Sequence, residues 1–313
     1  MSLREHSAPN SESASLESAP STELEGVRES LSGYRGRPLA ELLEGRYRVR
    51  FAGNAGDLER VLRLRFEVFN LEMNEGLQAS YGLGLDLDAF DMVCDHLMVE
   101  ETLTGRLVGT YRLQLASEKA DGLGLYCAQE YDLSTLPPDV INQSVELGRA
   151  CVAPADRNGH ALFALWRGLA AYAQWTKRRY FFGCCSLTSQ DKAEGRAFER
   201  FLVRKGHMRE DIHVEPWEAL ACGDAGQALV EEPAPKVPTL FASYLRFGAM
   251  VCSSAAIDRE FKTIDFLVLF DRQSLSMRVR RLIFSGIPEH DATGGYGNSS
   301  SSDSVSNGPP SVV

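Results

Sequence analysis

The chain has 313 residues, a hydrophobic fraction of 44% and a net charge of −10, values typical of a soluble globular protein with one large domain or two small ones. No window approaches the roughly 18 consecutive apolar residues of a membrane-spanning helix, and the polar N-terminus lacks the apolar core of a secretory signal. The six histidines and seven cysteines are scattered. We therefore expect a cytoplasmic protein with reduced, mostly buried thiols and no metal centre.

Periodicity predicts alternating strands and helices in the first half of the chain. A strand is predicted over residues 46–52 and a helix over residues 55–73, from period-two and helical spacing of apolar residues. A loop rich in Gly and Asp follows over residues 76–91. Residues 94–101 and 106–116 then have the pattern of a hairpin.

The second half continues the alternation. Strands are predicted over residues 144–152, 180–187 and 263–271, and helices over residues 159–179 and 191–206. Asp191 is placed to cap the last of these helices, and Gly206 is placed to end it. The order of elements predicts a mixed α/β fold.

Composition separates a folded centre from two polar ends. Residues 1–43 are rich in Ser and Glu, and residues 286–313 are rich in Ser and Gly. Such segments bury too little apolar surface to offset the entropy lost on ordering, so we predict disorder in both. Residues 44–285 are predicted to form one domain.

The strand "SVELGRACV" over residues 144–152 carries two opposite charges around a glycine. In a regular strand Glu146 and Arg149 would face opposite sides, but a glycine inside a strand often marks a β-bulge. A bulge at Gly148 would bring both charges to one side and free backbone N–H groups for an acyl oxyanion. Glu146 could then take a proton from an attacking amine. The alternative is a salt bridge buried within the sheet.

Five segments, in this order, carry a resemblance to a known family: "LRLRFEVFNLEM", "DLDAFDMVCDHLMV", "GTYRLQ", "ELGRACV" and "FASYLRFGAMVCSSAAIDREFKTIDFLVL". Over roughly residues 46–285 the chain resembles the acyl-carrier-protein-dependent ornithine N-acyltransferases. These are similar to acyl-homoserine lactone synthases and N-acyl amino acid synthases. The resemblance implies a GCN5-related N-acyltransferase fold, with a mostly antiparallel central sheet, a splayed and bulged strand, and flanking helices.

The resemblance also implies an activity. A long-chain (3-hydroxy) fatty acyl group would pass from acyl-carrier protein to the α-amino group of ornithine, which gives lyso-ornithine lipid. Acylation of another amine, such as glycine, lysine or tyrosine, remains open, as does a non-catalytic acyl-binding module. The Glu146–Arg149 pair argues against the module, because binding alone would not require the carboxylate.

The resemblance further implies the site residues. The catalytic group is Glu146, Gly148 and Arg149. The substrate-binding group is Arg65, Phe66, Glu72, Asp86, Asp88, Asp91, His96 and Arg112. A late motif adds Tyr244, Gly248, Asp258, Phe261 and Asp265. Where the family often has a Gly-Pro-rich turn, this chain has Ser253, Ser254 and Ala255.

Several of these residues have a purely structural alternative. Arg65 could be a surface charge, the acidic loop could cap a helix, and His96 in an apolar strand is typical of a core histidine. Arg112 in an apolar strand needs an acidic partner or a ligand, because an unpaired buried charge is costly. The acidic loop could supply that partner.

The donor is predicted from the segment "VAPADRNGHALF". Coenzyme-A-dependent members of this fold have an R-x-x-G-x-G/A loop that holds a pyrophosphate on backbone N–H groups. Arg157 and Gly159 are present, but the spacing is one residue too short. This favours acyl-carrier protein as the donor and no bound cofactor.

Basic residues suggest where the donor docks. Residues 156–209 have a local excess of Lys and Arg, although the whole chain is acidic. Acyl-carrier proteins are small and acidic, so a basic face would orient their docking; a solvated face is the alternative, and no nucleic-acid recognition motif is present. The predicted docking residues are Lys177, Arg178, Arg179, Arg196, Arg200 and Arg204.

The segment "MRVRRLIF" over residues 277–284 places arginines beside apolar residues. That pattern suits an anionic lipid interface. We therefore predict peripheral contact with the inner face of the cytoplasmic membrane. The alternative is an ordinary terminal helix that packs on the domain.

Overall fold

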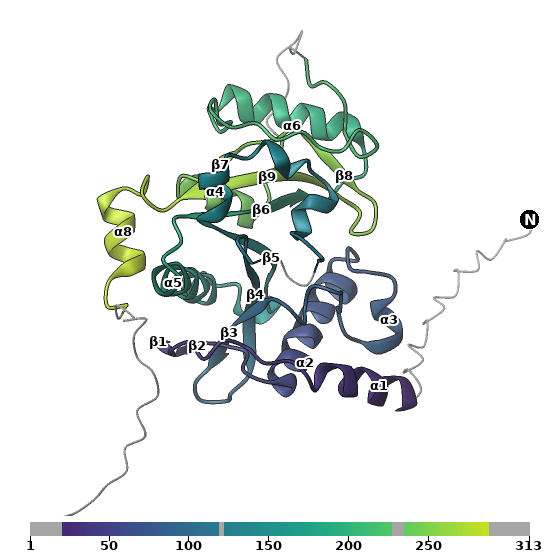
Figure 1. Ribbon diagram of the computed structural model, residues 1–313, viewed down its shortest axis with the longest axis vertical. Helices are drawn as coiled ribbons and strands as arrows, with labels where there is room; N and C mark the ends of the chain where they lie inside the picture. Colours follow the sequence, from purple (N-terminus) through teal and green to yellow (C-terminus); the bar gives the residue numbers. More distant parts are fainter. Residues whose placement is uncertain (1–20, 119–121, 227–234, 288–313) are drawn as a thin grey trace, which may run out of the picture.

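The structure is a computed structural model that describes residues 21–118, 122–226 and 235–287. Within these ranges one sheet runs through the molecule (Figure 1) in the strand order β1-β2-β3-β4-β5-β6-β9-β7, with β8 paired to β9. Neighbouring strands are antiparallel except β5 and β6. The strands are β1 (Leu42–Glu44), β2 (Tyr47–Phe51), β3 (Asp95–Glu101), β4 (Leu107–Leu115), β5 (Ser144–Val152), β6 (Tyr180–Leu187), β7 (Met250–Val251), β8 (Ala256–Asp258) and β9 (Thr263–Asp271). The predicted mixed α/β fold is confirmed.

Helices cover both faces of the sheet. On β3, Leu97 and Val99 belong to the core beneath α5, whereas Met98 belongs to the core beneath α2, as the alternation of a strand requires. The α-helices are α1 (Ser21–Leu31), α2 (Ala55–Arg65), α3 (Ser80–Leu83), α4 (Pro138–Asn142), α5 (His160–Trp175), α6 (Lys192–Arg204), α7 (Thr239–Arg246) and α8 (Met277–Phe284). Short 3-10 helices are η2 (Tyr126–Gln129), η3 (Leu133–Thr135) and η4 (Pro154–Asp156).

Helix α5 lies unusually close to the sheet because of one glycine. A Cβ atom at Gly168 would lie 2.6 Å from Cδ1 of Leu97 and 2.9 Å from Cγ1 of Val49. Glycine therefore allows the helix to approach β2 and β3, and the largest hydrophobic core forms between them.

Part of the N-terminal segment is ordered, which corrects the predicted disorder of residues 1–43. Residues 21–31 form α1, and Leu31 and Tyr34 are buried against the core of α2. Tyr34 donates to the carbonyl of Cys94, and Arg28 pairs with Glu59 at 3.0 Å. Two buried residues, Leu31 and Tyr34, are too few to produce an apolar pattern in a segment rich in Ser and Glu.

The remaining parts of the predicted tails lie mostly outside the described residues. Residues 1–20 and 288–313 are not described. Of the predicted C-terminal tail, Ile287 is described and packs into the main core, so the folded part extends slightly beyond residue 285.

The predicted bulge in β5 exists, but it lies one residue later than expected. Thr110 pairs with Cys151 and Arg112 pairs with Gly148, so β5 carries one extra residue between these pairs. The left-handed residue is Arg149, with φ of 51°, and not Gly148. The bulge therefore sets the direction of the Arg149 side chain.

The helix predicted over residues 55–73 changes character halfway. It is α-helical to Arg65 and continues as a π-helical turn over Phe66–Glu72. Such turns occur often at functional sites, and this one directs Phe69 into the cavity described below.

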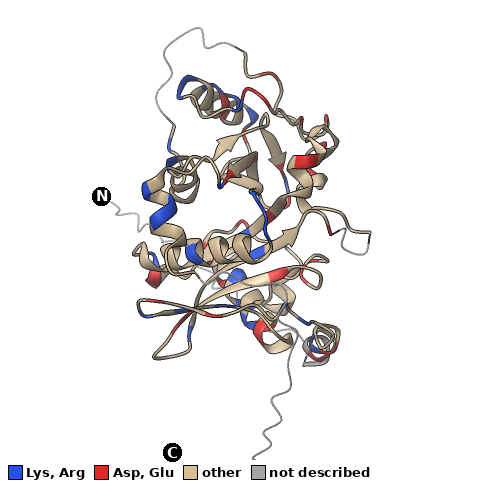
Figure 2. Cartoon of the chain, turned by 60° about the vertical axis from the view of Figure 1, so that its left-hand side comes forward, with Lys and Arg blue, Asp and Glu red and all other residues tan. Residues whose placement is uncertain are grey.

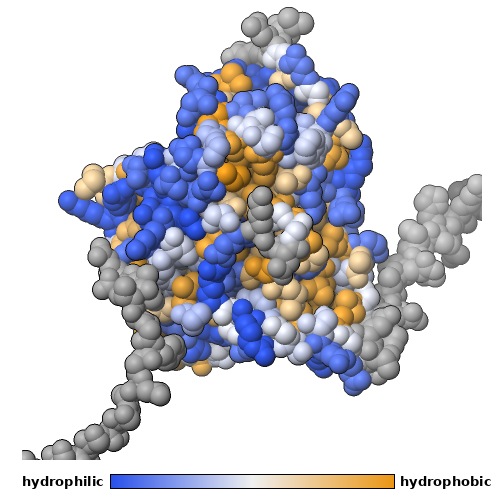
Figure 3. Space-filling view, in the orientation of Figure 1, coloured by the Kyte–Doolittle hydropathy of each residue, from blue (hydrophilic) through white to orange (hydrophobic). Residues whose placement is uncertain are grey.

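Apolar surface is present on the exterior but does not form a membrane span. No helix among the described residues combines the length and hydropathy needed to cross a bilayer. On the face shown in Figure 3, apolar surface gathers between the upper part, which carries α6, and the lower part, which carries α2 and α3.

Candidate active site

The site forms where two parallel strands diverge. Strands β5 and β6 pair only along Ser144–Glu146 and Tyr180–Phe182. Beyond these residues β5 stays with β4, whereas β6 stays with β9. A cavity occupies the opening, and both diverging strands line it. At its edge the carbonyl oxygen of Leu147 would lie 2.2 Å from a Cβ atom on Gly183, so only glycine fits there.

The cavity is lined from both faces of the sheet and differs in character between them. Phe181 and Cys185 face the core of α5 and α7, whereas Phe182, Cys184 and Ser186 face the opposite side. The first side is apolar and includes Phe241, Tyr244, Val268 and Phe270. The second side carries Tyr126, Arg149, Asp258, Phe261 and Asp265. One end can therefore hold a hydrocarbon chain and the other a charged group.

Glu146 is buried and both of its carboxylate oxygens are engaged. Oε1 accepts from the N–H of Cys127 at 2.7 Å, and Oε2 accepts from the N–H of Tyr126 at 2.8 Å. Burial raises the pKa of Glu146, although these two N–H groups act against the rise. The residue is not part of the cavity wall defined by the described residues. Its visible role is to hold the first residues of η2.

Arg149 does line the cavity, and it does not pair with Glu146. Its Nη2 donates to Asp88 at 2.8 Å, and its Nε lies 3.3 Å from Asp86. The guanidinium also lies over the ring of Phe261 at 4.1 Å and over that of Tyr126 at 5.0 Å. These contacts hold a residue in the left-handed region, a conformation that costs on the order of 1–3 kcal/mol and gathers at functional sites.

Arg149 belongs to a largely buried network of three arginines and three aspartates. Arg65 donates to Asp86 at 2.7 Å and to Asp91 at 2.6 Å. Arg112 donates to Asp88 at 2.6 Å and to Asp91 at 3.2 Å. Burial opposes the charge on Asp91, but Arg65 and Arg112 hold the pKa of this carboxyl well below its ordinary value.

The network accounts for most of the residues expected to bind substrate. The acidic loop supplies the predicted partner of Arg112. However, Arg65 is fully buried rather than a surface charge, and it pairs with both Asp86 and Asp91. Their geometry supports the position of Arg149 instead of direct contact with a ligand in the cavity.

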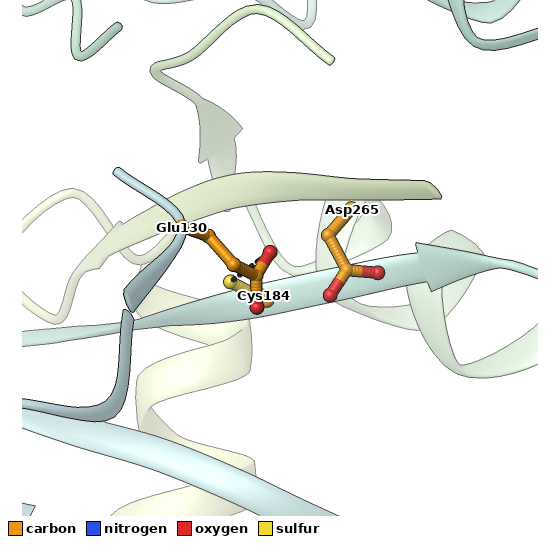
Figure 4. Close-up of side chains that lie close together, drawn as sticks. All are labelled: Glu130, Cys184 and Asp265. Atoms are coloured by element: carbon orange, nitrogen blue, oxygen red, sulfur yellow. Dashed lines mark hydrogen bonds between the residues drawn. The ribbon is translucent and has the colours of Figure 1, made fainter. Parts of the chain in front are cut away.

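A second group of acids lies at the polar end of the cavity (Figure 4). Ligand atoms of Glu130, Cys184 and Asp265 all lie within 4.8 Å of one another. The thiol of Cys184 points toward Glu130 at 3.9 Å, and Oδ1 of Asp265 is buried with no hydrogen-bond partner among the described residues. Burial is the main reason that the pKa of Asp265 rises to about 6 and that of Glu130 rises well above its ordinary value.

Three ligand atoms at these distances could also surround a metal ion, so the absence of a metal centre stays a prediction. The hydrogen bond with Cys127 and burial raise the pKa of the Cys184 thiol, while burial and Asp265 raise that of Glu130. Raised pKa values of this kind suit a group that exchanges a proton.

Comparison with known proteins decides the family. Residues 64–167 match the family model described as an acetyltransferase (GNAT) domain. The L-ornithine N(alpha)-acyltransferase of Brucella abortus is 31% identical over 250 residues, which cover 75% of this chain and 87% of that protein. The protein of the same name from Rhodobacter capsulatus is 32% identical, with 75% of this chain and 93% of that protein covered. The chain belongs to the L-ornithine N(alpha)-acyltransferase family. It is an N-acyltransferase with a GNAT fold, as the resemblance implied.

Solved structures with a similar fold include acyl-homoserine lactone synthases. MesI is 17% identical, with 72% of this chain and 86% of that chain covered and a TM-score of 0.42. LasI is 12% identical, with 78% and 98% covered and a TM-score of 0.42.

The three remaining residues predicted to bind substrate, like those of the arginine–aspartate network, lie outside the cavity wall. Glu72 forms an exposed ion pair with Arg157 at 2.5 Å. The ring of Phe66 packs edge-on against that of Tyr81. His96 is fully buried; burial lowers its pKa to about 4, and Nε2 contacts the carbonyl oxygen of Asp91 at 2.9 Å. His96 is thus a neutral core histidine, the structural alternative.

The predicted docking arginines are on the surface but take part in local contacts. Arg178 donates to the carbonyl of Asn142 at 2.8 Å, and Arg179 pairs with Asp271 at 2.6 Å. On α6, whose basic residues are coloured in Figure 2, Arg196 and Arg200 donate to the carbonyls of Cys222 and Ala225 at 2.6 Å. Lys177 and Arg204 are exposed.

Glu130 is the site residue that sequence reasoning missed. It follows η2 in a stretch without helical or strand periodicity, and its side chain is 5% exposed. The only local signal is an acid between the apolar Cys127 and Tyr131. Cys184 was read as an ordinary strand residue, whereas Asp265 was named by the late motif.

Proposed function

We propose that the chain transfers a long-chain (3-hydroxy) fatty acyl group from acyl-carrier protein to the α-amino group of ornithine, forming lyso-ornithine lipid. One observation carries the proposal: the cavity crosses the sheet where β5 and β6 diverge, with one apolar end and one acidic end. The names of the homologues support ornithine as the acceptor.

The acyl chain would occupy the apolar end. There the cavity is bounded by Phe181, Phe241, Val268 and Phe270. Burying the acyl chain against them contributes about 25 cal/mol of binding free energy per Å² of apolar surface removed from water. Tyr111 and Tyr244, whose hydroxyls are hydrogen-bonded to each other, also line it.

The amino acid would occupy the charged end. Ornithine carries two ammonium groups and one carboxylate, so its site needs both acids and a cation. Asp258 provides negative charge on the wall for the side-chain ammonium, and Arg149 provides the positive charge for the carboxylate.

The loop before α5 supports acyl-carrier protein over a nucleotide donor. A pyrophosphate would need N–H groups and cations that are free to bind it. Here Arg157 binds Glu72 and the carbonyl of Val152, and Asn158 accepts from the N–H of His160 at 3.0 Å. The Arg157 guanidinium and the N–H of His160 are therefore engaged within the chain, which favours a donor without a nucleotide.

The proposal is tested by incubating the purified chain with ornithine and either acyl-carrier-protein thioester or the matched acyl-coenzyme A. We expect an ornithine amide, detected by mass spectrometry, at a much higher rate from the carrier-protein thioester. Equal or faster acylation from coenzyme A would contradict the donor, and amide formation only with glycine, lysine or tyrosine would contradict the acceptor.

We predict that Arg196→Glu combined with Arg200→Glu raises the KM for acyl-carrier protein about tenfold and leaves the KM for ornithine unchanged. The reason is that complementary charge orients docking and raises the association rate by about tenfold or more. Salt screens the attraction between exposed charges, with a Debye length of roughly 8 Å at physiological ionic strength. Wild-type activity should therefore also fall as salt rises.

A matched control separates charge from loop anchoring. Arg196→Gln with Arg200→Gln removes the charges but keeps a donor for the carbonyls of Cys222 and Ala225. A raised KM in both double variants indicates docking by charge. An unchanged KM in the Glu variant would place docking elsewhere.

We propose peripheral membrane contact through α8. Ile283 is buried and its carbonyl accepts from Arg167 at 2.6 Å, so the helix packs on the domain. Met277 and Leu282 are nevertheless 64% and 54% exposed beside the exposed Arg278 and Arg281. The packing of Ile283 confirms a terminal helix on the domain, and the exposed face supports the proposed contact.

Reversing two charges on α8 should weaken that contact. Each basic residue near an anionic surface contributes about 1 kcal/mol, so Arg278→Glu with Arg281→Glu should reduce binding to phosphatidylglycerol vesicles at least tenfold in a sedimentation assay. Phosphatidylcholine vesicles are the control surface. Undiminished binding to anionic vesicles would refute the assignment.

A further inference from the structure

We propose that Asp265, supported by Glu130, accepts the proton that the α-ammonium group of the acceptor must lose before it attacks the acyl carbonyl. This inference rests on the proposed function and names a catalytic residue for it. It replaces Glu146 in the role that the sequence suggested.

The position of Asp265 carries the proposal. Its side chain lines the cavity although the residue is only 5% exposed, and Oδ1 has no hydrogen-bond partner among the described residues. An unpartnered buried oxygen is costly, so this atom is available to a ligand in the cavity.

The register of the sheet places this oxygen beside the bulge. The last β5–β6 pair joins Glu146 to Phe182, so Gly148 and Cys184 both lie two residues beyond it, where the strands diverge. The Asp265 carboxylate lies within 4.8 Å of the Cys184 thiol. The acid is therefore level with the bulged strand, where an acyl carbonyl can meet unpaired backbone N–H groups.

Glu146 is less suited to this task. Both of its oxygens already accept backbone N–H groups, and it lies outside the cavity wall. Its carboxylate instead fixes the first turn of η2, and Glu130 follows that helix directly. Glu146 is thus a positioning residue for Glu130.

The charges around Asp265 suit a base that works near neutral pH. Burial raises its pKa to about 6, and the negative charge of Asp258 on β8 acts in the same direction. The hydroxyl of Ser186 acts most strongly against the rise, followed by the hydroxyl of Thr263 and by the neighbouring Glu130 carboxyl, a hydrogen-bond donor when protonated. The other titratable groups that interact electrostatically with this pair are Tyr126, Cys127, Tyr131, Arg149, Cys184 and, from the other side of β6, Cys185.

The proposed step balances without another reactant. The α-ammonium gives one proton to the Asp265 carboxylate, and the neutral amine attacks the thioester carbonyl. As the C–N bond forms and the C–S bond breaks, the departing thiolate takes the second proton from nitrogen. Asp265 then returns its proton to solvent, which leaves an amide and a free thiol.

The test measures kcat and KM for ornithine with acyl-carrier-protein thioester between about pH 5 and pH 8. Because the base must be deprotonated, wild-type kcat should rise with pH through the raised pKa of Asp265. Asp265→Asn should lower kcat by roughly 10²–10⁴, remove this rise and leave the KM for ornithine nearly unchanged. Glu130→Ala should move the rise to higher pH, because it removes one of the hydrogen-bonding groups that lower the pKa of Asp265.

Glu199→Gln is the matched control. Glu199 is another buried acid whose pKa burial raises, but it accepts from Ser254 and Ala255 and is not in the cavity wall. Its replacement should leave both kcat and the pH profile unchanged. Thermal unfolding of each variant shows whether it is folded.

Three outcomes would overturn the inference. One is a folded Asp265→Asn variant with wild-type kcat; another is a wild-type kcat that does not vary over this pH range, which needs no variant. The third is an Asp265→Asn variant whose KM is raised for ornithine but not for norvaline, the analogue without the side-chain amine. Asp265 would then bind the side chain of ornithine. If the wild type forms no ornithine amide at all, the proposed function fails instead.

Discussion

Replacing Arg65 with methionine is expected to lower the free energy of unfolding by about 3–5 kcal/mol. Arg65 is fully buried and binds two aspartates, Asp86 and Asp91, which are themselves fully buried. Without the guanidinium, two carboxylates would remain in the interior with reduced compensation, and removing one partner of a buried ion pair is far more costly than breaking a surface pair. Urea denaturation measures the difference.

Arg63→Met is the control on the same helix. Arg63 is half exposed and pairs with Glu59 at 3.0 Å, the kind of surface pair that contributes about 0–1 kcal/mol. The two variants therefore differ mainly in burial. A change of less than 1 kcal/mol for Arg65→Met, together with a raised KM for ornithine, would instead support the substrate-binding role that the resemblance implied.

Glu146→Gln is expected to lower kcat by about 10²-fold, because misplacement of a site by roughly 1 Å has effects of that size. The amide offers one acceptor oxygen where the carboxylate offers two. Its NH₂ group would face the N–H of Tyr126 or Cys127, which both donate to Glu146. The first turn of η2 would shift, and Glu130 with it.

The pH profile distinguishes this positioning role from a direct role as base. If Glu146 only holds η2, kcat of Glu146→Gln should still rise with pH, since Asp265 remains. Loss of the rise in a folded Glu146→Gln variant, combined with its retention in Asp265→Asn, would return the role of base to Glu146.

Sequence reasoning predicted the features that periodicity encodes. The strands and helices of the central domain, the antiparallel hairpin β3–β4 and the cap at Asp191 follow from patterns of a few neighbouring residues. The bulge in β5 followed from a glycine inside a strand. Its position was off by one residue, because the left-handed conformation of Arg149 is stabilised by Asp88 and by two aromatic rings that come from distant segments.

Pairing between distant charges is what the sequence could not resolve. An arginine in a family motif suggests a ligand, but Arg65 meets acids that are 21 and 26 residues away and folds into the interior with them. Likewise, Glu130 comes near Asp265 because its neighbours Cys127 and Tyr131 pack against β6 and β9. Local patterns carry no information about such contacts.

The central claim is that the chain acylates ornithine on its α-amino group. It is tested most directly by expressing the chain in a bacterial host that makes no ornithine lipids and analysing the extracted lipids by tandem mass spectrometry. The account predicts new lysolipids that contain ornithine with a long acyl chain in amide linkage to the α-nitrogen, and their loss in a host that carries Asp265→Asn. Amides of another amino acid, or no new lipid despite a folded and soluble protein, would contradict it.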